Sequence, residues 1–63
     1  MDYQWLSGLA EREDYQSRLV IFEDMCRCLR DAGVELTDYF VECDKLAEVL
    51  HIPDAVLKSS VKF

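Results

Sequence analysis

The sequence predicts an all-α fold in which a long helix pairs with an antiparallel medium helix, as an αα-hairpin, and a short helix follows at the C-terminal end. Two observations predict this class. Apolar residues recur every three or four positions along most of the 63-residue chain, which is the spacing of one helix face. Only two glycines and one proline interrupt the sequence, at positions where helix ends are expected. A chain of this length makes a single domain, residues 1–63.

The long helix is predicted over about residues 9–32. No glycine or proline stands between Leu9 and Ala32, and Gly33 fits a C-terminal stop. Acidic residues crowd the first turns and arginines crowd the last turns, which suits the helix dipole. These features indicate one unbroken helix.

The other two helices are predicted over about residues 38–50 and 53–60. Thr37 or Asp38 can serve as the N-cap of the medium helix. This helix should end at His51-Ile52-Pro53, because the residue before a proline avoids helical geometry. Pro53 can then occupy the first position of the short helix.

Two apolar rows are expected on the long helix. One row packs against the stripe of the medium helix and forms the core seam, which comprises Tyr15, Leu19, Phe22, Cys26 and Leu29 with Tyr39, Cys43, Leu46 and Leu50. The second row lies beside it, and the two rows together are too wide for one neighbouring helix to cover. We therefore expect a homodimer that completes a helical bundle, because monomers seldom expose such a patch. The expected dimer or partner interface is Arg18, Ile21, Met25 and Cys28.

The net charge of −6, from 13 acidic and 7 basic residues, disfavours DNA binding. One pattern nevertheless resembles a helix-turn-helix, with Ala47 in the first helix, Leu50 before the turn and Leu57 after it. The position usually filled by glycine in that turn holds His51. The alternative function is therefore a DNA-binding regulator built on residues 38–60, with nucleic-acid contacts from Lys45, Lys58 and Lys62. An acidic protein that mimics DNA is a further alternative.

The sequence carries no pattern for catalysis or for a cofactor. Cys26-x-Cys28, Cys43 and His51 could be imagined as zinc ligands, but residues two apart on a helix point about 200° apart and cannot share a metal ion. No serine or cysteine shows a nucleophile signature, and there is no glycine-rich phosphate loop. We therefore expect a non-enzymatic protein with no cofactor, no metal site and no catalytic residues.

Cysteine usage and hydropathy indicate a cytoplasmic protein. The three cysteines are an odd number, and the opening residues do not form a signal peptide, so a reduced environment is expected. No stretch approaches the ~20 apolar residues that span a bilayer, so no membrane partner is expected.

Short strings along the chain resemble a known group of phage proteins. The opening Met1-Asp2-Tyr3-Gln4, the run Glu11-Arg12-Glu13-Asp14 and the helix start Ile52-Pro53, together with the length, look like the small accessory proteins of the exo–xis region of lambdoid bacteriophages. The resemblance implies an early protein in the cytoplasm of the bacterial host. It implies a regulatory protein–protein interaction with a host or phage protein that modulates host physiology or the lysis–lysogeny decision. It identifies no functional residue.

Overall fold

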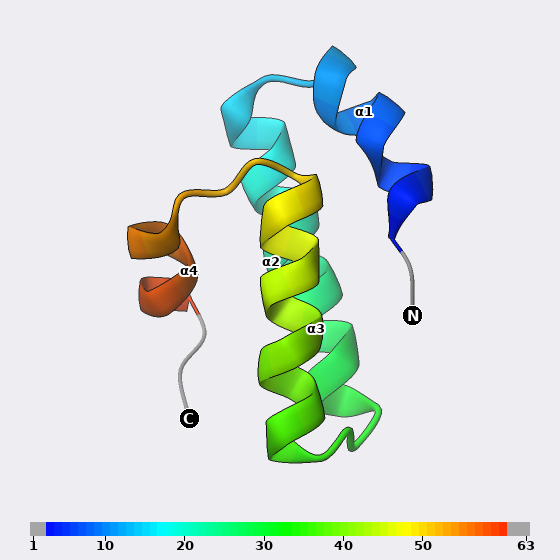
Figure 1. Cartoon of the computed structure of the whole chain (residues 1–63), viewed down its shortest axis with the longest axis vertical. Helices are drawn as coiled ribbons and strands as arrows, with labels where there is room; N and C mark the ends of the chain where they lie inside the picture. The colour runs from blue at the N-terminus through cyan, green and yellow to red at the C-terminus, as the bar shows by residue number, and fades with distance from the viewer. Residues whose placement is uncertain (1–2, 61–63) are drawn as a thin grey trace.

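The computed structural model describes residues 3–60, and all of their regular structure is helical, which confirms the predicted class. The helices pack together into one small body (Figure 1). In chain order they are a 3-10 turn η1 (Gln4–Leu6), α1 (Ser7–Arg12), α2 (Tyr15–Asp31), α3 (Leu36–Val49) and α4 (Asp54–Ser60).

The prediction of one helix over residues 9–32 is wrong, because the chain breaks between α1 and α2. Glu13 and Asp14 have extended backbones, with ψ of 150° and 172°. The Asp14 carboxylate accepts a hydrogen bond of 2.8 Å from the backbone N–H of Ser17, so Asp14 is the N-cap of α2. Aspartate is among the strongest N-caps, and here its local hydrogen bond competes successfully with a continuous helix. The break lets α1 leave the axis of α2.

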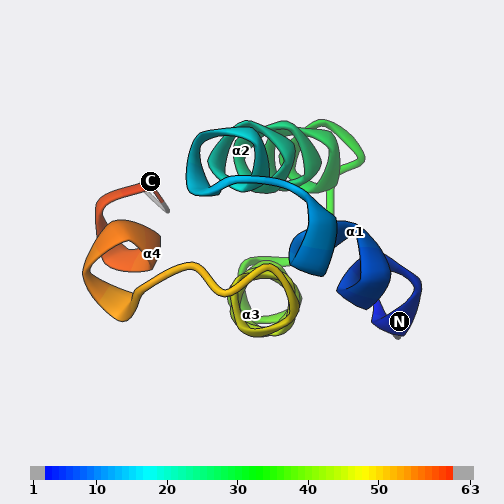
Figure 2. The same cartoon turned by 90° about the horizontal axis from the view of Figure 1, so that it is seen from above.

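Helices α2 and α3 lie side by side in both views, and the chain reverses direction between them (Figures 1 and 2). Gly33 makes this reversal possible with a φ of +77°, a value that costs glycine little. The N–H groups of Gly33 and Val34 bond back to the carbonyls of Arg30 and Leu29, which is a Schellman ending. Figure 2 shows α1 on one flank of the α2–α3 pair and α4 on the other.

The boundaries of α3 and α4 shift slightly from the prediction. Helix α3 begins at Leu36, with Glu35 at its N-cap position, so neither Thr37 nor Asp38 is the cap. It ends at Val49, and His51 then adopts a φ of +58°. Helix α4 begins one residue after Pro53, whose carbonyl accepts the first bonds of the helix.

The core is centred on Phe22, Leu46, Leu50 and Cys43, which are at most 1% exposed. Of the nine residues of the predicted seam, six are buried, and Leu19 and Leu29 are partly buried against them. Tyr15 is the exception: it is 39% exposed because it stands in the first turn of α2, beside the break that the sequence did not reveal. Residues outside the predicted seam complete the core, namely Tyr3, Leu6, Ala10, Ala47 and Ile52.

Candidate functional site

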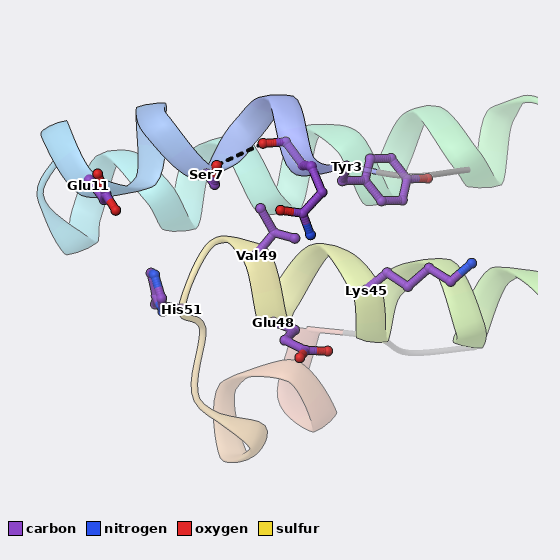
Figure 3. A pocket seen from close by; sticks show the side chains of 8 residues that line it. Tyr3, Ser7, Glu11, Lys45, Glu48, Val49 and His51 are labelled. Carbon is purple, nitrogen blue, oxygen red and sulfur yellow. Dashed lines mark hydrogen bonds between the residues drawn. The ribbon is translucent and has the colours of Figure 1, made fainter.

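Two of the grooves on the surface of the described residues lie on opposite flanks of α3. The larger, of about 720 Å³, runs between the N-terminal segment and the C-terminal half of α3. Its side chains are spread along it, with Glu11 and His51 at one end and Tyr3 and Lys45 at the other (Figure 3). The lining residues are Tyr3, Gln4, Ser7, Glu11, Lys45, Glu48, Val49 and His51.

Two polar groups of this first groove, those of Ser7 and Tyr3, serve the fold. The Ser7 hydroxyl donates a 2.8 Å hydrogen bond to the backbone carbonyl of Gln4, which secures the start of α1. The buried Tyr3 hydroxyl donates to the carboxylate of Glu42. Burial and this hydrogen bond raise the pKa of Tyr3 to about 12, and the same bond lowers the pKa of Glu42. The arrangement ties the N-terminal segment to α3.

The second groove, of about 330 Å³, lies between α3 and α4. Its lining combines apolar surface with acidic side chains: Phe40, Cys43, Asp44, Asp54, Leu57 and Lys58. Leu36 stands one helical turn before Phe40 on the same face of α3 and is 56% exposed, while Phe40 is 44% exposed. Figure 1 shows α4 beside the later turns of α3. The groove and Leu36 together are called the α3–α4 surface below.

The residues predicted to form the dimer or partner interface all lie on α2. Ile21 and Met25 are partly buried and pack against the core, whereas Cys28 is exposed. Arg18 is held on its own helix: its Nε donates to the Asp14 carbonyl at 3.3 Å, and its guanidinium lies 5.7 Å from the centre of the Tyr15 ring.

Of the lysines predicted to contact nucleic acid, the two within the described residues line different grooves. Lys45 lines the first groove, where its Nζ is 3.7 Å from a carboxylate oxygen of Glu42. Lys58 lines the second groove, on the opposite flank of α3, and Lys62 is outside the described residues. The structure therefore does not bring Lys45 and Lys58 together into one basic strip for a phosphate backbone.

The cysteines are placed as a buried pair and an exposed single residue. Cys26 of α2 and Cys43 of α3 face each other with their sulfur atoms 3.2 Å apart, and Cys28 lies on the exposed side of α2. Within residues 3–60, no three metal-ligating side chains come together. His51 lies in the first groove, away from the cysteine pair.

Comparisons with known proteins give no relative from which a site could be transferred: no family model matches the chain, and neither do curated proteins or solved structures. None of the helices in the described part of the chain has the length and hydropathy to cross a membrane.

Sequence reasoning missed the α3–α4 surface. The predicted core seam does not include Phe40, and Leu36 precedes the helix predicted over residues 38–50. The available signal was their spacing of four residues, which puts both on one face once α3 is known to begin at Leu36. The position of α4 beside them is a tertiary feature that the periodicity of the chain does not encode.

Proposed function

We propose that this protein is a small, non-enzymatic protein–protein interaction module whose α3–α4 surface binds an apolar and basic helical segment of a partner. The observation that carries the proposal is the exposure of Leu36 and Phe40 next to an acidic groove. Large apolar side chains gathered on one face are typical of interaction sites. A groove between helices suits an amphipathic helix, whose anchors recur every three or four residues.

Charge complementarity selects the kind of partner. The α3–α4 groove contains the carboxylates of Asp44 and Asp54 and the single ammonium of Lys58, and the whole chain carries a net charge of −6. A basic segment is attracted to this field, while a second copy of the chain is repelled. We therefore favour a basic partner over a second copy as the occupant of this surface.

The resemblance to phage accessory proteins extends the proposal to a biological role. On that basis the partner is a host or phage protein in the bacterial cytoplasm, and binding regulates its activity. The homodimer through Arg18, Ile21, Met25 and Cys28 stays a prediction, although Ile21 and Met25 already pack against the core of one chain.

Nuclear magnetic resonance with a defined probe tests the proposed surface. The probe is a helical peptide of leucines and lysines with the leucines on one face, added to the ¹⁵N-labelled full chain. We expect amide shifts to concentrate on Phe40, Asp44 and Leu57. Shifts confined to the first groove, or no shifts, would contradict the proposed surface, as would equal binding of a scrambled peptide or of one with glutamates in place of lysines.

Matched substitutions distinguish binding at the α3–α4 surface from nonspecific adsorption to exposed apolar side chains. Phe40→Ser removes an apolar side chain from the groove, whereas Val20→Ser removes one of similar exposure, 49%, from α2. We expect Phe40→Ser to weaken peptide binding on the order of tenfold and Val20→Ser to leave it unchanged, since one anchor contributes about 1–2 kcal/mol. Equal effects of the two substitutions would show that the peptide adsorbs to any exposed apolar side chain.

A further inference from the structure

The buried cysteine pair has a geometry that its role in the core does not require. Cys26 and Cys43 come from different helices and are 17 positions apart in the chain, yet their sulfur atoms are 3.2 Å apart and share a hydrogen bond. A disulfide bond is about 2.05 Å long, so a modest movement of the two side chains brings the sulfurs to bonding distance. The two thiols are free in this structure.

Each thiol of the pair also reaches a surface groove. Cys43 lines the groove between α3 and α4. Cys26 lines a separate depression of about 180 Å³, together with Glu23, Arg27, Arg30 and Tyr39. Cys26 is 7% exposed and Cys43 is 1% exposed, so Cys26 is the cysteine of the pair that a small oxidant meets more readily in the folded chain.

We propose that Cys26 and Cys43 form an oxidisable pair that closes into an intramolecular disulfide between α2 and α3 when the protein meets a peroxide. One thiolate attacks a peroxide oxygen, the O–O bond breaks, and a sulfenic acid forms while the leaving oxygen takes up protons as water. The second thiol then attacks the sulfenic sulfur, and a second water leaves as the S–S bond forms. Two thiols are oxidised and one hydrogen peroxide is reduced to two waters.

The surroundings of the pair set its rate. Burial raises the pKa of Cys26, the hydrogen bond with Cys43 raises it further, and the nearby Arg30 guanidinium opposes this effect. Because the thiolate is the reactive form, oxidation at neutral pH is slow. As long as the pH stays below the pKa of the thiol, the rate of oxidation rises about tenfold for each unit by which the pH is raised. The pair therefore responds to sustained oxidation.

Peptide mapping of the oxidised wild-type chain provides the direct test. Trypsin cleaves after Arg18, Arg27, Arg30 and Lys45, so Cys26, Cys28 and Cys43 fall on three separate peptides, 19–27, 28–30 and 31–45. After hydrogen peroxide treatment of the folded protein, we expect the intact mass to fall by two hydrogen atoms. We expect peptides 19–27 and 31–45 to be joined, and dithiothreitol to separate them.

The disulfide should also be visible in stability. It closes a loop between the two helices, so we expect the melting temperature to rise on the order of 10 °C and to return on reduction. Cys28→Ser should keep both effects, because Cys28 is the exposed cysteine outside the pair. Cys43→Ser should abolish them and leave a sulfenic acid on Cys26 that dimedone traps. Cys26→Ala serves the same purpose if the first variant does not fold.

Three outcomes would overturn the proposal. The first is a link that includes peptide 28–30 in place of the expected one. The second is oxygen addition at Cys26 or Cys43 without a link. The third is a link that forms only when the chain is unfolded in urea, since that would mean that the fold does not bring the pair together for reaction.

Discussion

Two residues with positive φ end the two longest helices, and they use the same backbone device. Gly33 follows α2 and His51 follows α3. At each position the N–H bonds to the carbonyl three residues earlier, and the next N–H bonds to the carbonyl five residues before it, as in a Schellman ending. Glycine adopts this conformation freely, whereas histidine pays a steric cost at its Cβ atom. His51, which stands at a turn position usually filled by glycine, therefore has a locally strained backbone.

Exchanging the two residue types tests this interpretation. We expect His51→Gly to raise the free energy of unfolding by about 0.5–1 kcal/mol, because the strain at φ of +58° disappears. We expect Gly33→Ala to lower it by about 1 kcal/mol or more. No atom lies within 4 Å of the position of the added Cβ, so the backbone angle alone accounts for the loss. Urea denaturation measures both. A less stable His51→Gly variant would mean that the imidazole makes a contribution larger than the strain.

At the scale of elements, the sequence determined the two central helices well and the N-terminal segment poorly. The stripe of α3 and the stop at Gly33 follow from periodicity and glycine placement, which are local properties. The break at Glu13 and Asp14 depends on a competition between the N-cap formed by Asp14 and a continuous helix. The residues on both sides of the break favour helix equally, so the sequence pattern does not mark the break. Once the break is made, η1 and α1 can cover one flank of the α2–α3 pair, and Tyr3, Leu6 and Ala10 become core residues.

The hydrogen bond between Tyr3 and Glu42 makes the attachment of this segment dependent on pH. The pKa of Tyr3 is raised to about 12 in the folded chain, above the value of about 10 expected for an unfolded chain. Its stabilising contribution is therefore complete below about pH 10 and is lost as the pH rises toward 12. The lowered pKa of Glu42 gives the opposite pH dependence of stability. The contribution of Glu42 to the stability of the fold is lost as the pH falls below about 4.

Tyr3→Phe removes the hydroxyl and keeps the ring. We expect it to lower the free energy of unfolding at pH 8 by about 1 kcal/mol, because Glu42 loses a hydrogen-bond donor. We also expect a smaller loss of stability between pH 10 and 12 than in the wild type. Urea denaturation across this range provides the measurement, and Tyr15→Phe is the control, since Tyr15 is exposed. Identical pH profiles for wild type and Tyr3→Phe would show that Tyr3 does not carry the alkaline dependence.

For the molecule as a whole, the sequence predicts more apolar surface than one chain can bury, and several large apolar residues are exposed in the structure. The homodimer expected to cover such surface stays a prediction. A second copy is expected from the sequence because the two apolar rows of the predicted long helix are together wider than one neighbouring helix covers. In the structure Ile21 and Met25 pack against a core that includes Tyr3 and Leu6. The exposed large apolar residues are Trp5, Tyr15, Val20, Leu36, Phe40 and Val41, and two of them, Tyr15 and Val20, belong to α2. The sequence predicts where each apolar residue lies along its helix. Which flank of the α2–α3 pair stays exposed depends on where α1 and α4 pack, and this is a tertiary feature.

Salt dependence distinguishes a basic partner from a second copy, because the net charge of −6 acts oppositely in the two cases. Attraction between the acidic α3–α4 surface and the leucine–lysine peptide is screened as the Debye length falls from about 14 Å to about 4 Å between 0.05 and 0.5 M salt. We expect the peptide affinity to drop on the order of tenfold over this range, chiefly through slower association. Two copies of the chain repel each other, so the same salt should strengthen any self-association. Titration calorimetry measures the first effect and sedimentation equilibrium the second. If peptide binding does not change with salt, charge complementarity is not the basis of partner choice. If a dimer forms at 0.05 M salt and the Leu36→Asp substitution abolishes it, the occupant of the α3–α4 surface is a second copy of the chain.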